Sequence, residues 1–238
     1  MSCCLSEHEI LDGVASQYNS RRDFDHYLIE FGAELILKDF SGHRMLEVGC
    51  SSGVMTRIFA THVPELHVVD GSETYIAALR KELGSQVRCF TNLAEEFSPS
   101  TNFDGVVMAS LLEHVEDPAA VLMRSRQWLK ANGSLFVIVP NRNSIHRQIG
   151  VKMGILERLD SLSDRDRMLN HRRIYDLALL DNHLQQAGYQ IRDRKGIMIK
   201  PLSNAQMESW SPELIRALLD VGLYKPDIAA QIYLRCTH

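Results

Sequence analysis

The chain has 238 residues, 45% hydrophobic and 24% charged, with a formal net charge of −4 at pH 7. Such a length fits one α/β domain, or a domain with a small cap, and buries enough surface to fold without disulfide bonds. Five cysteines without paired spacing argue against a disulfide framework or a zinc site, and the charge argues against bulk nucleic-acid binding.

We expect a reduced, cytoplasmic, soluble protein. The N-terminus "MSCCLSEHEI" has no basic region followed by an apolar run, so it is not typical of a signal peptide. No run approaches the roughly 20 apolar residues that a membrane helix needs. The sequence therefore predicts no membrane partner.

Residues 5–40 have helical periodicity, with Phe31, Leu35 and Ile36 on one face, and 1–40 is predicted to form an N-terminal helical cap. Strands and helices then alternate within 41–238. The predicted elements are strands at 43–48, 66–69, 86–91, 103–109, 134–139, 189–200 and 228–236, and helices at 53–62, 72–84, 117–133, 175–188 and 211–222. Strands joined through helices are parallel and need cover on both faces, so we expect a doubly wound α/β fold with its ligand at the carboxyl ends of the strands.

The stretch "MLEVGCSSGVMT" (45–56) runs from a predicted strand through a turn of small residues into a helix. Gly49 and Gly53 permit a positive φ and close backbone approach, and the helix start adds unpaired N–H donors. A dinucleotide site would show G-x-G-x-x-G, which these residues do not match. The other interpretation is an S-adenosylmethionine site, and Asp70, ending the next strand, offers a carboxylate to ribose hydroxyls.

Glu47-x-Gly49-x-x-x-Gly53 resembles the first motif of class I methyltransferases, which commonly has a further glycine where Ser51 stands. "FDGVVMASLLEHVEDP" (103–118), "WLKANGSLFVIVPN" (128–141) and "HRRIYDLALLDNHLQQAGY" (171–189) resemble later signatures of the small-molecule type 11/12 group, which includes the ubiquinone-biosynthesis O-methyltransferases. The resemblance covers roughly residues 40–200. It implies a Rossmann-like sheet of seven strands with the last antiparallel, a helical lid, and S-adenosylmethionine as cofactor.

The resemblance also implies where the cofactor binds. It places the 47–53 loop around the methionine end, Asp70 on the ribose, the segment after the third strand against the adenine, and the end of the fourth strand near the sulfonium. Leu93 stands where the family usually has an aspartate. Arg21 or Arg22 is expected to pair with the methionine carboxylate, or to lie on a solvated helix face. The predicted cofactor residues are Glu47, Gly49, Cys50, Ser51, Gly53, Asp70, Gly71, Ser72, Asn92, Leu93, Ala94, Ala109, Ser110 and Arg22.

Methyl transfer needs orientation and desolvation, with a proton acceptor only for a hydroxyl or a protonated amine. His114 follows the fourth strand and is the predicted general base, the alternative being that it packs on the loop and orients cofactor or backbone. His146 and His171 are alternative candidates for the base, although both are expected to contact substrate or to be structural. Glu113 has no second ligand at useful sequence spacing, so no metal is predicted.

The segment 141–173 is predicted to form the acceptor-binding insertion. It carries eight basic side chains against four acidic ones, inside an acidic chain. Arginine forks suit carboxylates and phosphates, so we expect an anionic acceptor, the alternative being a solvated pair of helices with mixed charge. Apolar residues 149–156, with Met198 and Trp210, are expected to form the inner surface, the alternative being that they pack in the core. The predicted acceptor residues are His146, Arg147, His171, Arg172 and Arg173.

Three functions remain open at this stage. The first is a methyltransferase acting on an oxygen or nitrogen atom of a small molecule. The second, a macromolecule methyltransferase, would usually show Asn/Asp-Pro-Pro-Tyr/Phe after the fourth strand, where this chain has "MASLLEH". The third is a cofactor-binding protein without transfer activity, which fold alone does not exclude. The helix at 211–222 either completes the pocket or forms a homodimer face.

Overall fold

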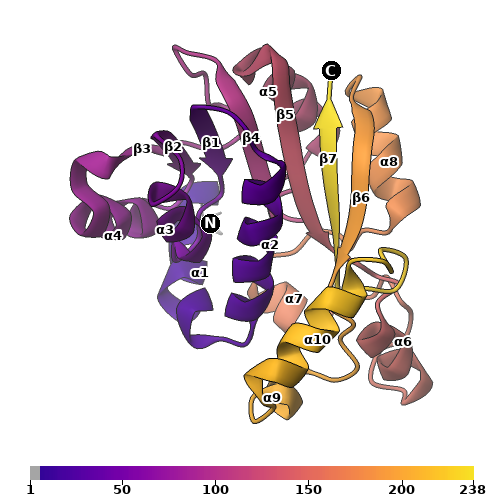
Figure 1. The fold of residues 1–238 in the computed structure, drawn as a ribbon. Coiled ribbons are helices and arrows are strands. Elements are labelled where there is room, and N and C mark those ends of the chain that lie inside the picture. The colour runs from indigo at the N-terminus through magenta and orange to yellow at the C-terminus, as the bar shows by residue number, and fades with distance from the viewer. Residues whose placement is uncertain (1–5) are drawn as a thin grey trace, which may run out of the picture.

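The structure is a computed structural model that describes residues 6–238. The chain forms a seven-stranded sheet in the order β3-β2-β1-β4-β5-β7-β6 (Figure 1). The strands are β1 (Arg44–Val48), β2 (Glu65–Asp70), β3 (Val87–Thr91), β4 (Phe103–Ala109), β5 (Leu129–Pro140), β6 (Gln190–Ile197) and β7 (Gln231–Thr237). Pairings from β3 to β5 are parallel, whereas β7 is antiparallel to both β5 and β6, which confirms the predicted fold class.

Helices cover both faces of the sheet because its central strands are buried on both sides. Alternation in β1 sends Met45 into one core and Leu46 into the other. The first core packs against α2 (Asp25–Asp39), α3 (Val54–Ala60), α4 (Glu73–Leu83) and α10 (Pro212–Gly222), and the second against α5 (Pro118–Trp128) and α8 (Leu177–Gln186). Because both faces of the sheet are covered, a ligand is expected to approach it at the carboxyl edge.

Helix starts follow their predicted caps. Ser72 accepts a hydrogen bond from the backbone N–H of Tyr75, and Asp117 accepts one from that of Ala120. The predicted helix 117–133 is wrong at its end, because α5 stops at Trp128. Leu129 adopts an extended backbone and pairs with Phe103, so the chain enters β5 directly.

Four further helices gather at the carboxyl edge of the sheet, in the lower half of Figure 1. They are α1 (Glu7–Gln17), α6 (Ile145–Lys152), α7 (Asp164–Met168) and α9 (Asn204–Met207). 3₁₀ turns lie at Ser20–Arg22 and Gly84–Gln86. The predicted N-terminal helical region thus consists, within the described residues, of α1, a 3₁₀ turn and α2, and Cys3 and Cys4 lie outside the described part. None of the described helices combines the length and apolar character needed to cross a bilayer.

Candidate functional site

The loop between β1 and α3 is folded around an aspartate from the next strand. Oδ2 of Asp70 accepts hydrogen bonds from the backbone N–H groups of Cys50 (2.8 Å) and Ser51 (3.1 Å), and Oδ1 accepts one from Ser72 (2.8 Å). Burial raises the pKa of Asp70, and these three N–H bonds oppose that rise. Since a carboxylate offers about four lone-pair positions, one acceptor position on Oδ1 remains for a ligand hydroxyl.

The loop conformation explains its small residues. Gly49, Ser51 and Gly53 have φ values of +82°, +48° and +76°. A Cβ on Gly53 would approach Leu79 to 2.5 Å, so glycine is required there by both space and backbone. Ser51, which stands in the place of the usual glycine, therefore adopts the left-handed conformation that the motif needs.

A cavity of about 790 Å³ opens beside this loop. It lies where the neighbouring strands β1 and β4 continue to opposite sides of the sheet, β1 to β2 and β3, and β4 to β5. Such a switch point is the usual ligand site of an open α/β sheet. Predicted cofactor residues on the cavity wall are Glu47, Gly49, Cys50, Ser51, Asp70, Gly71, Asn92, Leu93, Ala94, Ala109 and Ser110. The remaining predicted cofactor residues do not line the cavity: Gly53 is the N-cap of α3, Ser72 is the N-cap of α4, and Arg22 lies in the 3₁₀ turn Ser20–Arg22.

Helix α1 covers one side of the cavity. His8 Nδ1 lies 2.6 Å from the carbonyl oxygen of Gly71, and Asp12 accepts hydrogen bonds from the Ser72 hydroxyl (2.5 Å) and the Thr74 N–H (3.1 Å). A Cβ on Gly71 would meet Leu11 at 2.5 Å, so α1 packs directly on the turn after β2. The cap therefore contributes to the site as well as to the fold.

Glu47 is 2% exposed at the cavity wall, and its Oε2 has no hydrogen-bond partner among the described residues. Burial raises the pKa of Glu47 to about 8. A buried carboxyl oxygen without a partner is unfavourable. The position therefore favours a ligand that brings a hydrogen-bond donor or a positive charge.

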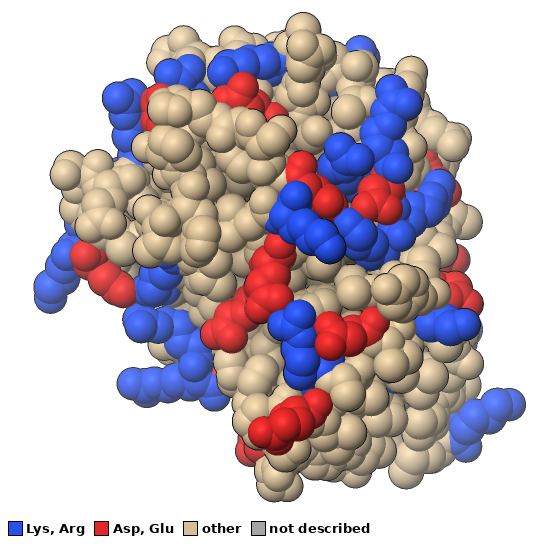
Figure 2. Space-filling model, viewed as in Figure 1, with Lys and Arg blue, Asp and Glu red and all other residues tan. Residues whose placement is uncertain are grey.

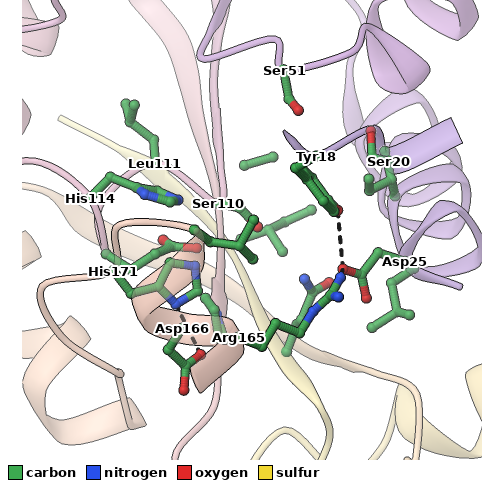
Figure 3. Close-up of a pocket in the computed structure, with 18 of the residues that line it drawn as sticks. Tyr18, Ser20, Asp25, Ser51, Ser110, Leu111, His114, Arg165, Asp166 and His171 are labelled. Atoms are coloured by element: carbon green, nitrogen blue, oxygen red, sulfur yellow. Dashed lines mark hydrogen bonds and ion pairs between the residues drawn. The ribbon is translucent and has the colours of Figure 1, made fainter. Parts of the chain in front are cut away.

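The end of β4 places the candidate base among other titratable groups. His114 and His171 pack edge to face with ring centroids 4.7 Å apart, and both line the cavity (Figure 3). Burial lowers the pKa of His114 to about 3, so its ring is neutral at pH 7. Ser110 has a φ of +50°, which turns the chain sharply from β4 into this loop.

Two adjacent arginines, Arg172 and Arg173, hold a loop in place. Arg173 donates to the carbonyl oxygens of Leu112 (2.8 Å), Val115 and Glu116 (2.9 Å). Arg172 donates to the carbonyl oxygen of His114 (2.7 Å) and pairs with Glu7 of α1 (3.1 Å). Neither arginine lines the cavity, although both were predicted to bind the acceptor.

Most other cations of 141–173 are also neutralised within the protein. Of the predicted acceptor residues, His146, Arg147 and His171 do line the cavity, but Arg147 is 6% exposed and its Nη1 lies 3.1 Å from Asp166. Lys152 is exposed. The remaining pairs are Arg142–Asp176, Arg158–Asp160 and Arg167–Asp164.

A polar group at the far end of the cavity was missed by the sequence reasoning. Arg165 pairs with Asp25 (2.6 Å) and Asp23 (2.9 Å). Tyr18 donates to Asp25 (3.1 Å), as Figure 3 shows. Lys200 also lines the cavity and donates to Asn204. The excess of basic residues in 141–173 did indicate that a residue such as Arg165 could bind an anion. Nothing in the sequence, however, linked residues 18–25 to residues 200–204.

The apolar wall partly follows the prediction. Ile149, Gly150, Met153, Ile155 and Leu156 line the cavity. The two residues predicted beside them do not: Met198 is fully buried in the core, and Trp210 packs against that core. Helix α10 packs on α2 and β6, and the segment 200–206 lines the cavity in its place.

Comparisons with known proteins agree with this architecture. The sequence profile of a family described as "Methyltransferase domain" matches residues 18–193. A ubiquinone biosynthesis O-methyltransferase of Rhodopseudomonas palustris (strain HaA2) is 29% identical over 178 residues, or 71% of this chain and 66% of that enzyme, so the aligned part spans just under two thirds of its length. The chain belongs to the methyltransferase-domain family.

Solved structures share the fold across nearly the whole chain. N-methyltransferase NodS from Bradyrhizobium japonicum WM9, in complex with S-adenosyl-L-homocysteine, has a TM-score of 0.64 at 15% identity and covers 96% of both chains. The Burkholderia thailandensis 1,6-didemethyltoxoflavin-N1-methyltransferase has a TM-score of 0.63 at 17% identity, covering 100% of this chain and 93% of that one. At these identities the likeness concerns the fold.

Proposed function

We propose that the chain is an S-adenosylmethionine-dependent methyltransferase acting on an oxygen or nitrogen atom of a small molecule. The observation that carries the proposal is the meeting of the 49–53 loop with Asp70 at the switch point of the sheet, beside a cavity of about 790 Å³. That volume is within the range of sites for small molecules and cofactors. When bound, the cofactor supplies an electrophilic methyl group on a sulfonium.

The residues present fit this group. Glu47 offers an unpartnered carboxyl oxygen to an ammonium, Gly49 allows close approach of a ligand, and Asp70 keeps one acceptor position for a ribose hydroxyl. Asn92, Leu93 and Ala94 line the cavity, and they offer two apolar side chains, one amide and backbone polar groups to a base. The chain's own contribution to the reaction is then to hold and orient two molecules and to exclude water.

Two segments cover the cavity, helix α1 and the insertion at 141–173, and their contacts support the exclusion of water. Helix α1 is attached by Asp12 to the start of α4, and Glu7 of α1 pairs with Arg172 from the other cover. The second of these contacts joins the cap directly to the insertion. The predicted insertion at about 141–173 thus has a defined role in the proposal, as one half of an enclosing surface.

We further propose that the acceptor is small and carries an anionic group, a carboxylate or phosphate, held near Arg165 and Lys200. These cations line the cavity, and burial lowers the pKa of Lys200, which favours a ligand that brings negative charge. Asp23 and Asp25 already balance Arg165, so the proposed acceptor meets a paired cation rather than a free one.

A small acceptor is favoured over a nucleic acid by the surface charge. In Figure 2, Lys and Arg side chains on the face shown lie mostly beside Asp and Glu, without a continuous basic tract. Nucleic-acid binding usually relies on such a tract.

The test is methyl transfer from methyl-labelled S-adenosylmethionine to a panel of hydroxylated and amino acceptors, with and without carboxylate or phosphate groups. We expect S-adenosylhomocysteine release with at least one acceptor, and far less with an Asp70→Asn variant at a cofactor concentration near the wild-type Kd. Cofactor binding without transfer to any acceptor would favour a non-catalytic binding protein. Absence of cofactor binding would overturn the whole proposal.

A further inference from the structure

Lys200 differs from the two arginines of the cavity wall because it has no carboxylate partner. Arg147 is paired with Asp166 and Arg165 with Asp25, so the charge of each guanidinium is offset within the protein. Within residues 6–238, the Lys200 ammonium forms no ion pair. Lys200 is therefore the cation of the wall that has a charge left for a ligand.

The amide of Asn204 stands between the Lys200 ammonium and the acids of this region. Its side-chain oxygen accepts a hydrogen bond from Nζ of Lys200, and its Nδ2 donates to Asp23 (2.8 Å) and Asp25 (2.9 Å). An ammonium group carries three N–H donors, so two remain for a ligand. Burial lowers the pKa of Lys200, because the charged form has lost solvation, and a negatively charged ligand oxygen compensates for that loss.

The backbone on both sides of Lys200 is fixed. Met198 has a φ of +63°, which residues other than glycine rarely adopt and which persists only where the surroundings enforce it. Here the N–H of Ala230 donates to the carbonyl oxygen of Met198 (2.8 Å), and a Cβ on Gly222 would collide with the Met198 backbone. Pro201 restricts Lys200 itself to an extended backbone. The bend after β6 thus presents Lys200 to the cavity in a defined position.

His146 lies near Lys200 in the same wall. Burial, and then the positive charge of Lys200, lower the pKa of His146 to about 3, so its ring is neutral at pH 7. Its Nδ1 is buried and has no hydrogen-bond partner among the described residues. A neutral imidazole keeps one donor and one acceptor nitrogen, so the ring offers a hydrogen bond to a group that also contacts the ammonium.

We infer that Lys200 and His146 form a binding site for a single carboxylate group, and that Lys200 sets the charge of the molecule that enters this end of the cavity. A phosphate monoester carries about −1.5 to −2 charges at pH 7, of which one ammonium group offsets only one. Arg165 does not offset the second charge, because Asp23 and Asp25 already balance it. A buried charge without a partner is costly, so the site prefers a carboxylate to a phosphate.

The carboxylate belongs to the methyl acceptor if the proposed function holds, and this step rests on that function. It narrows the acceptor from anions in general to monocarboxylates. Binding of a carboxylate at Lys200 does not depend on methyl transfer. Lys200 lies outside the predicted insertion at 141–173, so counting charges over that segment did not include it.

Three ligands with the same ring test the site: benzoate, benzamide and phenyl phosphate differ in the charge of one group. Each is titrated into the full chain saturated with S-adenosylhomocysteine, whose own binding is first measured by calorimetry, and ligand binding is followed by saturation-transfer NMR. The variants are Lys200→Met and His146→Leu. The matched control is Lys130→Met, because Nζ of Lys130 also donates to one side-chain oxygen, Oδ1 of Asp104 (2.8 Å), but does not line the cavity. Circular dichroism checks that each variant is folded.

We expect the wild type and Lys130→Met to bind benzoate at least about 10-fold more tightly than benzamide or phenyl phosphate, because a charge-assisted hydrogen bond is about twice as strong as a neutral one. Lys200→Met should lose this preference, whereas His146→Leu should bind benzoate more weakly and keep it. Should Lys200→Met not fold, Lys200→Gln, which keeps a polar contact to Asn204, decides.

The inference is overturned if the wild type binds no benzoate, binds benzamide or phenyl phosphate as tightly, or if the Lys200 variant keeps the preference of the control. An unchanged Kd for benzoate in His146→Leu overturns the role of His146. Failure of S-adenosylhomocysteine to bind contradicts the proposed function alone, since the same titrations on the free chain still test the carboxylate site.

Discussion

Replacing Asp70 with asparagine removes a charge from the centre of the proposed cofactor site. Asparagine keeps one acceptor oxygen but turns its NH₂ group toward one of the N–H donors that Asp70 now satisfies. Hydrogen bonds to a charged group contribute about 1.5–3 kcal/mol each. Loss of the bond to the ribose hydroxyl, with a loosened 50–51 loop, should therefore weaken S-adenosylmethionine binding by about 2–4 kcal/mol, or roughly 30- to 1,000-fold in Kd.

The matched control is Asp104→Asn. Oδ2 of Asp104 also accepts two backbone N–H bonds, from His43 (3.0 Å) and Arg44 (2.8 Å), while Oδ1 accepts one from Lys130 (2.8 Å). Asp104 lies near the start of β4, at the edge of the sheet away from the cavity. Isothermal titration calorimetry should show weak binding by Asp70→Asn and unchanged binding by Asp104→Asn. Equal affinities in the two variants would refute the assignment of Asp70 to the cofactor.

Three further perturbations separate roles within the site. Because burial raises the pKa of Glu47 from its ordinary 4.5 to about 8, the folded chain binds more protons than the unfolded chain between these values. The stabilising effect of this proton, on the order of 5 kcal/mol, is therefore present below pH 4.5 and lost as pH rises toward 8. Urea unfolding from pH 5 to 8.5 should show a smaller loss of stability with pH in Glu47→Gln than in the wild type and in the exposed control Glu208→Gln; identical slopes would contradict the burial argument. Arg165→Met should raise the KM of an anionic acceptor about 10-fold or more with the cofactor Kd unchanged, since it removes a charge-assisted contact. Arg216→Met is its control, because Arg216 likewise pairs with acids, Glu34 and Asp220, and stacks over Phe31, away from the cavity; equal acceptor KM values in both variants would remove Arg165 from the acceptor site. Arg173→Ala should lower the free energy of unfolding by about 2–4 kcal/mol, measured by urea titration, because three carbonyl oxygens lose their donor. A selective rise in acceptor KM at unchanged stability would instead restore Arg173 as an acceptor contact.

The regular part of the fold was predictable because its signals are local. Buried strands such as 103–109 and capped helices such as the one after Ser72 depend on residues within a few positions of one another. The end of α5 was not predictable. The letters "WLKANG" are typical of a helix end with a turn, and Leu129 is extended only because it pairs with Phe103. Tertiary pairing overrides local preference there.

The candidate site likewise has a part that local sequence signals predict and a part that they do not. The loop at 49–53 and Asp70 were predictable because each follows directly from one strand and the next. The wall contributed by residues 200–206, and the approach of His171 to Glu113, depend on long connections whose path the sequence does not specify. Charge counting did not indicate the contacts of Arg172 and Arg173 with the backbone, because it records the side chains but not the carbonyl oxygens that they meet.

The central claim is that one small-molecule cofactor binds between the 49–53 loop and the carboxylate at the end of β2. The most direct measurement is calorimetric titration of the purified chain with S-adenosylmethionine and, in parallel, with NAD, whose binding fingerprint these residues lack. We predict saturable one-to-one binding of S-adenosylmethionine and no binding of NAD. Absence of S-adenosylmethionine binding, or equal binding of both, would contradict the account.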